Sequence, residues 1–453
     1  MGTKLKLSTY AFDVLTSIGG KTIGLFFSGR TGKNVFVSPY VFNSVKQGNL
    51  DNLDIHSKDL LIKSKILVPQ EEDEFVSVNL ENREILAIQN KRYSSHLYIS
   101  IQPTANCQLA CSYCGQEHKS KQLDHNTICR IENDINKRLS ASKYTDLEIG
   151  WFGGEPLCAL GEMREINHRI VNLANMHNIG VLSHITTNGY ALSADVYREL
   201  KEDFNCKRIE ITLDGCKECH DKHRYTRNGH GSFEKIYNNL QEIISSGHYD
   251  KNVCMITIRC NVDLENIEGV IPLFHKLCSD NIQDKIRFYC ACVVSWANNG
   301  AGNAKTWELI GKKSTEYILY MREHGFEVDT LPHRSAPYVC LGTMKEAVMY
   351  DAYGNIYDCS ETAYSNRYYG GPLHLGNLGE EKSIRQNSVL MDIPQRLMTG
   401  KVARCKDCKY YPLCGGLCPL AIYEGEPRCP MFVFNLKDRM LIHAISELSG
   451  KNK

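Results

Sequence analysis

Residues 102–114 read Gln-Pro-Thr-Ala-Asn-Cys-Gln-Leu-Ala-Cys-Ser-Tyr-Cys, and this stretch is the most informative in the chain. It places three cysteines, Cys107, Cys111 and Cys114, within eight residues. Three thiolates suit an iron–sulfur cluster or zinc, and both usually take four ligands. The fourth ligand is missing from this run, so a four-iron cluster held here would keep one iron open for another molecule. A zinc site completed by a remote fourth ligand is the alternative.

The cysteine run follows an expected β-strand, because Leu97, Ile99 and Ile101 alternate in the sequence just before it. Similar strand patterns alternate with helical periodicity over some 200 residues, which makes about six strand–helix units. Such units form parallel strands in an open sheet or a barrel, so the fold class is α/β. The unusual residues lie just past strand C-termini, the functional rim of these folds. Strands are expected at 147–151, 181–187, 209–213, 253–262 and 285–294, and helices at 128–139, at 163–178, and after the caps Ser193 and Ser232.

Composition excludes several classes of function. The chain has 453 residues, a formal net charge of +1 and 20 cysteines. With a net charge near zero, the chain lacks the excess of positive charge that is typical of proteins that bind nucleic acid or an anionic membrane surface. No apolar run approaches the roughly 18 residues of a membrane span, and Asp13 interrupts the first apolar segment, which makes it a poor signal peptide. We therefore expect a cytoplasmic protein whose clustered cysteines bind metal.

Changes in sequence character predict the domain organisation. The first part combines a strand at 34–37, a helix leading into a strand at 58–68, a polar turn at 71–74 and a linker at 91–95. The stretch from 336 to 430 has many Gly, Tyr and Pro and little periodicity, which is typical of a metal-organised domain. The expected parts are an α+β module (1–92), a barrel (93–310), a bridging helix near 314–324 (within 311–335), a cysteine-rich domain (336–432) and a C-terminal helix (433–453).

With the preceding strand, and with Tyr113 directly before Cys114, the cysteine run resembles the radical S-adenosylmethionine (SAM) superfamily. The resemblance implies a partial (β/α)6 TIM-like barrel in which Cys107, Cys111 and Cys114 hold a catalytic [4Fe–4S] cluster. SAM would chelate the fourth iron. An electron from the cluster would split SAM into methionine and a 5′-deoxyadenosyl radical, which abstracts hydrogen from the substrate. The protein itself supplies position and excludes water.

Three further rim motifs match those with which the family binds SAM. They are Gly153-Gly154-Glu155-Pro156, Thr186-Thr187-Asn188-Gly189, and Thr212-Leu-Asp214-Gly215 followed by Arg224. Glycines allow close approach of main-chain groups, and an arginine can hold a carboxylate through two hydrogen bonds. A solvated surface role is the alternative for Arg224, and Arg259 is a second candidate for the same carboxylate. The resemblance implies SAM contacts from Tyr113, Gly153, Gly154, Glu155, Thr187, Asn188, Thr212 and Arg224.

The C-terminal cysteines resemble the seven-cysteine SPASM domain, which binds two auxiliary [4Fe–4S] clusters. They are spaced Cys340-x13-Gly354-x4-Cys359, then Cys405-x2-Cys408-x5-Cys414-x3-Cys418, then Cys429. The resemblance assigns Cys405, Cys408, Cys414 and Cys429 to an outer cluster and Cys340, Cys359 and Cys418 to an inner one. A zinc ribbon at 405–418 is the alternative, but it leaves the other three cysteines unexplained.

The inner cluster lacks an obvious fourth ligand. Another residue completes it, such as Cys290 or Cys292, or the site stays open for a substrate thiolate. Cys290 and Cys292 end the last expected barrel strand, and packing in the core is the alternative for both. The remaining scattered cysteines are interpreted as small buried hydrophobic residues.

The whole pattern most resembles maturases of ribosomally made peptides, which form thioether or carbon–carbon crosslinks. Residues 1–92 would then read the leader of a precursor peptide along a sheet edge, or would be a plain structural extension. A flavodoxin or ferredoxin would be the reductant. Anaerobic sulfatase maturases, the nearest alternative, carry an aspartate base where this chain has Ser360, although Glu361 follows it. A multi-cluster electron carrier is the alternative of another class, and it would need no SAM pocket.

Overall fold

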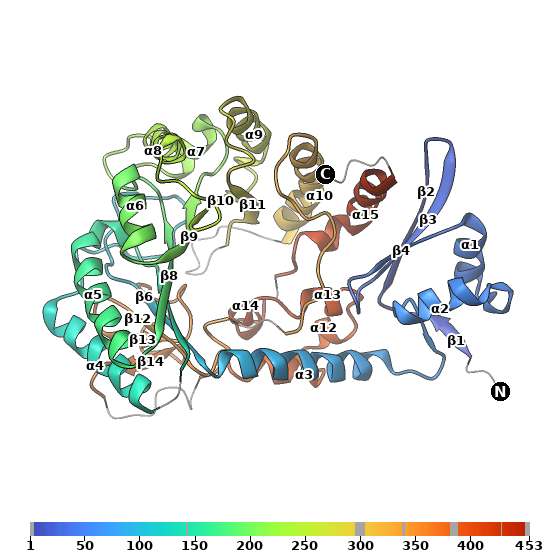
Figure 1. Ribbon diagram of the computed structural model, residues 1–453, viewed down its shortest axis with the longest axis horizontal. Helices are drawn as coiled ribbons and strands as arrows, with labels where there is room; N and C mark the ends of the chain where they lie inside the picture. Colours follow the sequence, from blue (N-terminus) through green and yellow to red (C-terminus); the bar gives the residue numbers. More distant parts are fainter. Residues whose placement is uncertain are drawn as a thin grey trace.

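A nine-stranded sheet organises the molecule (Figure 1), in the order β11-β10-β9-β8-β7-β6-β12-β13-β14. The computed structural model describes residues 4–141, 144–294, 304–337, 340–380, 388–426 and 428–448. Strands β6 to β11 are parallel, β12 adds in parallel to β6, and β13 and β14 follow as antiparallel neighbours. This confirms the expected α/β class and its parallel sheet. The strands are β6 (His96–Ile101), β7 (Asp146–Trp151), β8 (Gly180–Thr187), β9 (Cys206–Thr212), β10 (Met255–Val262), β11 (Arg287–Cys292), β12 (Ala347–Tyr350), β13 (Asn355–Tyr357) and β14 (His374–Asn377).

Helices cover the outer face of the parallel strands, and the main hydrophobic core lies between them and the sheet. Ile128, Ile131 and Ile135 recur at helical spacing on α4 and are fully buried there. Helix α10 begins earlier than expected, because Trp307 and Ile310 also pack into this core. No helix in the described ranges is long and apolar enough to cross a membrane. The helices are α4 (His125–Ala141), α5 (Leu160–Met176), α6 (Ala194–Glu202), α7 (Lys217–His223), α8 (Phe233–Ser245), α9 (Val270–Ser279) and α10 (Ala304–Glu323), with short 3-10 turns η2 (Pro156–Ala159) and η3 (Ile267–Gly269).

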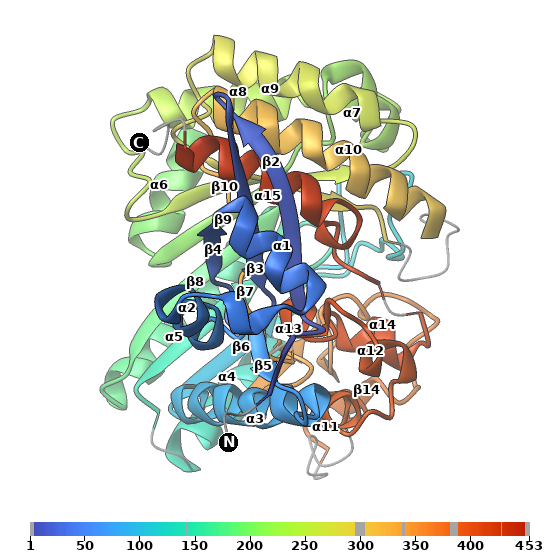
Figure 2. The same cartoon turned by 90° about the vertical axis from the view of Figure 1, so that its right-hand side faces the viewer.

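The N-terminal segment forms a three-stranded antiparallel sheet that is covered on both faces (Figure 2). Phe26 packs on Phe42 of helix α1, on one face. Phe27 lies on the other face, in a cluster with Met440 of the C-terminal helix α15. The two ends of the chain therefore share a core. The elements are β1 (Leu5–Leu7), β2 (Ala11–Ile18), β3 (Lys21–Ser28), β4 (Asn34–Val37), α1 (Pro39–Gln47), η1 (Leu50–Asn52), α2 (Ile55–Lys63), β5 (Leu67–Pro69) and α15 (Phe432–Leu448).

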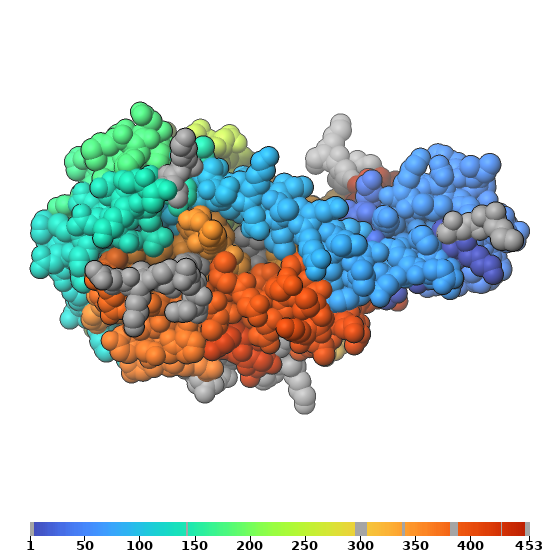
Figure 3. Space-filling view, turned by 90° about the horizontal axis from the view of Figure 1, so that it is seen from below, coloured from blue at the N-terminus to red at the C-terminus, as the bar shows by residue number. Residues whose placement is uncertain are grey.

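A long helix, α3 (Glu74–Tyr93), joins this segment to the barrel and runs beside the cysteine-rich segment (Figure 3). The expected linker at 91–95 is wrong in its first three residues, which are helical. The Asp73 side chain caps the helix by accepting from the Val76 N–H at 3.1 Å, and no Gly or Pro breaks the helix before Tyr93. Short helices carry the cysteine-rich segment, namely α11 (Ile393–Met398), α12 (Ala403–Lys406), α13 (Tyr411–Cys414) and α14 (Pro419–Tyr423).

Two expected helix caps have different outcomes. The Ser193 hydroxyl accepts from the Val196 N–H at 3.2 Å, which confirms the cap of α6. Ser232 precedes α8 but makes no side-chain cap. Its hydroxyl donates instead to the Arg224 carbonyl, and it lies 2.9 Å from His220 Nε2. Ser232 thus fixes the segment that carries Arg224.

A charged cluster of His96, Glu148 and His184, on the neighbouring strands β6, β7 and β8, lies on the sheet face opposite the main core. His96 Nε2 lies 3.2 Å from Glu148 Oε2, and His184 Nδ1 lies 2.8 Å from Glu148 Oε1. Hydrogen bonding to Glu148 raises the pKa of His96, and Asp146 adds to this. Burial opposes ionisation of Glu148, yet hydrogen bonds to His184 and His96 lower its pKa to about 2.

This arrangement predicts a pH-dependent stability. Because the pKa of His96 is higher in the folded chain, its stabilising effect is complete below the unfolded value of about 6.5 and is lost as the pH rises through the folded value. We expect the free energy of unfolding of the wild type to fall over that window. His96→Asn should flatten the dependence, as measured by denaturant titration. His56→Asn, at an exposed position of α2, is the control, and a His96→Asn profile as steep as the wild type would contradict the prediction.

Candidate active site

The turn after β7 clamps the cysteine loop that follows β6. Gly153 has a φ of +129°, which favours glycine. At Gly154 a Cβ would lie 2.4 Å from the Asn106 carbonyl oxygen. The Gly154 N–H donates to the Thr104 carbonyl at 3.1 Å, and the Glu155 N–H donates to the Asn106 carbonyl at 2.8 Å. The structure therefore places both glycines against the backbone of the cysteine loop.

Glu155 joins this turn to the end of β8. Its buried carboxylate accepts from Thr187 Oγ1 at 2.5 Å and from the Asn188 N–H at 2.7 Å. Burial raises the pKa of Glu155, while these hydrogen bonds oppose the rise. Asn188 Nδ2 in turn donates to the Cys107 sulfur at 3.6 Å. Glu155, Thr187 and Asn188 thus form a chain of contacts that ends at a cysteine.

A second buried network surrounds the Tyr113 hydroxyl, which donates to Asp214 Oδ2 at 2.5 Å. The hydroxyl accepts from Arg224 Nη1 at 2.7 Å and from Asn261 Nδ2 at 3.2 Å. Arg224 is only 7% exposed, and its guanidinium lies 4.0 Å from Asp214. The surface alternative for Arg224 is therefore wrong, because the residue after α7 turns into the rim. Its Nε is buried without a hydrogen-bond partner in the described residues.

The charge of Arg224 acts on all three cysteines of the loop. Burial raises the pKa of Cys111 to about 11, and it raises the pKa of Cys107 and Cys114 as well. The positive charge of Arg224 opposes the rise at each of them. Since the thiolate is the form that binds metal, a buried cation close enough to act on all three thiols fits a site for an anionic iron–sulfur cluster.

The cysteine loop opens into a cavity of about 190 Å³ at the C-terminal ends of the strands. A larger cavity of about 440 Å³ has a lining of tyrosine and polar side chains, with no cysteine among the described residues, so we place the site in the smaller one. The smaller cavity combines residues of the barrel with one residue of the cysteine-rich segment, Glu361. Among the residues that line it are Tyr113, Cys114, Thr186, Thr212, Arg259 and Glu361.

The residues predicted to contact SAM fall into two groups, those that line the cavity and those that support the cysteine loop. Tyr113 and Thr212 line the cavity, whereas Gly153, Gly154, Glu155, Thr187, Asn188 and Arg224 are absent from its described lining and support the cysteine loop. Thr186 belongs to the predicted rim motif but not to the predicted SAM contacts, and it lines the cavity. Its side chain is on the strand face opposite to that of Thr187, and only the register of β8 reveals this.

The C-terminal cysteines lie near one another in two groups. Cys405, Cys408, Cys414 and Cys429 line one small cavity, which we name the outer cavity. Cys340 and Cys418 lie close enough to Cys359 to influence its pKa, which burial raises most, followed by the charge of Glu361. No group of three or more metal-ligating side chains in the described ranges is drawn into coordinating geometry. The grouping of these cysteines is nevertheless compatible with a metal cluster bound by their thiolates.

Cys290 and Cys292 do not join the inner set. Cys290 pairs in register with Cys260, on the strand face opposite to that of Arg259 and Tyr289. Cys292 is buried in the core beneath the helices, and Cys290 packs against that core. Neither is placed to be the fourth inner ligand, and the packing alternative accounts for both.

The contact at Gly154 predicts a selective defect. Gly154→Ala forces a methyl group against the Asn106 carbonyl, so we expect a loss of about 1–3 kcal/mol in stability and a lower iron content after anaerobic reconstitution. Gly161→Ala, where the added Cβ meets nothing within 4 Å, is the matched control. Equal iron content in the two variants would argue against the clamp.

Residues 101–272 match the family described as the Radical SAM superfamily. The chain is 31% identical over 150 residues to the GTP 3′,8-cyclase of Clostridium botulinum (strain Okra / Type B1), covering 33% of this chain and 44% of that protein. It is also 31% identical over 178 residues to the cysteine-type anaerobic sulfatase-maturating enzyme of Clostridium novyi (strain NT), covering 38% and 46%. The chain thus spans less than half the length of these curated relatives.

The fold is similar to a solved structure described as native anSMEcpe with bound AdoMet and Cp18Cys peptide. The TM-score is 0.57 at 17% sequence identity, and the match covers 79% of this chain and all of that one. At this identity the similarity shows the fold alone. The sequence matches identify residues 101–272 as a radical SAM domain and the protein as an enzyme.

Proposed function

We propose that this enzyme is a radical SAM peptide maturase that forms a thioether or carbon–carbon crosslink in a ribosomally made precursor peptide. The observation that carries the proposal is the composition of the 190 Å³ cavity. Cys114 of the barrel and Glu361 of the cysteine-rich segment both line it. A substrate bound there lies between the radical SAM cysteines and the inner cysteine set.

Cys107, Cys111 and Cys114 would hold the [4Fe–4S] cluster that the family uses. When bound, cluster and SAM supply a 5′-deoxyadenosyl radical that takes hydrogen from the substrate. The protein residues provide the setting. Arg224 supplies a fixed positive charge beside the thiolates, and the Gly153–Gly154 turn holds their backbone.

The grouping of the seven C-terminal cysteines favours two auxiliary clusters in a SPASM-like arrangement. With the cluster of the cysteine loop, the proposed enzyme holds three clusters. Four of the C-terminal cysteines line the outer cavity, and three lie together near Glu361. Their role in a crosslinking reaction is to take up the electron released when the new bond forms. A zinc ribbon does not account for the grouping of Cys340, Cys359 and Cys418.

The N-terminal sheet supports a peptide as the substrate. Both of its faces are covered, and its edge strands are β2 and β4, to either of which an extended leader can add as a strand. The similar anSMEcpe structure was solved with a bound peptide. A flavodoxin or ferredoxin in the cytoplasm is the proposed reductant.

The second candidate is a protein-directed maturase of the sulfatase type. The identity to the Clostridium novyi enzyme favours it, and Glu361 lines the cavity where a base would be needed. Ser360 weighs against it, because serine has no useful basicity near neutral pH. An electron carrier is disfavoured, because it needs no cavity beside the cysteine loop. Incubation with a sulfatase peptide and with a precursor peptide encoded beside the gene separates the two maturase candidates by product mass.

The proposed chemistry predicts that a variant with Cys107, Cys111 and Cys114 all changed to Ala releases no 5′-deoxyadenosine. Wild-type protein, reduced anaerobically and given SAM, should release it, as measured by liquid chromatography with mass detection. Cys129→Ala, outside both cysteine groups, is the control and should match the wild type. Release of 5′-deoxyadenosine by the triple variant at the wild-type rate would contradict the assignment of radical SAM chemistry to these cysteines.

A further inference from the structure

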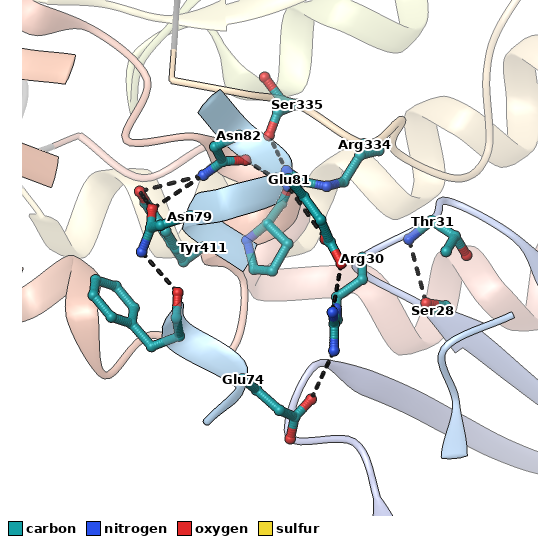
Figure 4. Close-up of polar contacts among 12 residues, drawn as sticks. Ser28, Arg30, Thr31, Glu74, Asn79, Glu81, Asn82, Arg334, Ser335 and Tyr411 are labelled. Atoms are coloured by element: carbon teal, nitrogen blue, oxygen red, sulfur yellow. Dashed lines mark hydrogen bonds and ion pairs between the residues drawn. The ribbon is translucent and has the colours of Figure 1, made fainter. Parts of the chain in front are cut away.

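A buried polar network connects the N-terminal sheet with the cysteine-rich segment (Figure 4). Its first half centres on Arg30, which follows β3 and is 4% exposed. The Arg30 guanidinium donates to Glu72 Oε1 at 2.8 Å and also to Glu81, and it lies 3.8 Å from Glu74. A buried cation without such partners is strongly destabilising, so these carboxylates fix α3 against the N-terminal sheet.

The second half lies on an adjacent side of α3 and is linked to the first, because Arg334 Nη2 lies 4.0 Å from Glu81 Oε2. Asn79 and Asn82 are both almost fully buried. The Tyr411 hydroxyl donates to Asn79 Oδ1 at 2.8 Å, and Asn82 Oδ1 accepts from Arg334 Nη2 at 2.5 Å. Arg334 Nη1 also donates to the Pro412 carbonyl at 2.5 Å. One helix therefore joins the N-terminal sheet to residues 411 and 412.

Tyr411 belongs to the wall of the outer cavity. It lies between Cys408 and Cys414 in the sequence and lines the same cavity as the four cysteines. Its N–H donates to the Cys408 carbonyl at 3.0 Å, and its ring lies 5.8 Å from the ring of Phe75, on α3. Cys405 and Cys408 pack against the apolar cluster that contains Tyr10, Val78 and Tyr411.

We propose that α3, with the N-terminal segment docked on it, supports the outer metal site: Asn79 and Asn82 position Tyr411 and the cysteines around it. Docking of that segment and filling of the outer cavity are then one linked event. The inference rests on the proposed function, because it takes the outer cavity to hold an auxiliary cluster.

The physical reason is the number of buried polar groups that face one another across this contact. If α3 moves, the buried Asn79 and Tyr411 and the largely buried Arg334 lose hydrogen-bond partners, which is far more costly than losing a surface contact. Linkage then works in both directions, so a filled outer cavity stabilises the docked N-terminal segment by the same free energy. A peptide bound to the N-terminal sheet would act on the outer site through this helix.

The test uses the full chain, reconstituted anaerobically with iron and sulfide. The positioning variants are Asn79→Ala with Asn82→Ala, and Tyr411→Phe, which keeps the ring but loses the hydroxyl. The matched control is Arg164→Ala, which breaks an exposed pair with Glu199 at 2.6 Å on the barrel. We expect the double variant to lose roughly four irons per chain, one four-iron cluster. Tyr411→Phe should keep its iron and change the electron paramagnetic resonance signal of the outer cluster, and the control should change neither.

The reciprocal test measures amide hydrogen exchange over β2 and β3. Cys405→Ala with Cys408→Ala should speed exchange there, whereas changing Cys107, Cys111 and Cys114 to Ala should not. The inference is overturned if the Cys405/Cys408 variant loses iron but β2 and β3 exchange as in the wild type, or if the Asn79/Asn82 variant keeps its full iron and signal. A Cys405/Cys408 variant with undiminished iron would instead overturn the auxiliary cluster itself, and the inference with it.

Discussion

The buried charge of Arg224 is the interaction on which the candidate active site depends. A cation out of water costs several kcal/mol unless it is paired, and here Asp214 and the Tyr113 hydroxyl meet it. That pairing requires the ends of β9 and β10 and the segment after α7 to converge beneath the cysteine loop. As a result, the fixed positive charge of Arg224 lies beside the three cysteines of the loop, where it stabilises their thiolate forms. The side chain that is predicted to contact SAM thus also places its charge beside the three cysteines.

The sequence was sufficient to predict the parallel sheet and the place of the cysteine loop on its rim. Alternating apolar residues mark each strand, and the first strand ends just before Gln102. The resemblance to the SPASM pattern assigned Cys405, Cys408, Cys414 and Cys429 to one cluster, and in the structure these four cysteines line one cavity. The direction of individual side chains was not predictable, because it depends on register. Thr186 and Thr187 have the same local sequence signal, yet only Thr186 reaches the cavity.

Other features depend on contacts between distant segments, and no local pattern reports them. Ser232 has the sequence of a helix cap, but a buried carbonyl of Arg224 competes for its hydroxyl. Residues 91–93 are polar enough for a linker, yet the helix capped at Asp73 continues through them. Asn79 and Asn82 are ordinary helix-surface residues in sequence, and they become buried only because Tyr411 and Arg334 approach from the other end of the chain.

The position of β6 also bears on how the chain is made. This strand pairs with β7 on one side and with β12 on the other, and β12 begins only at Ala347. While the ribosome synthesises the barrel, one edge of β6 therefore stays unpaired until most of the protein has emerged. An open strand edge is a template for aggregation, and pairing over such a separation is slow. A product truncated before Ala347 keeps this edge exposed beside the cysteine loop, so the C-terminal segment protects the nascent barrel before it takes any part in catalysis.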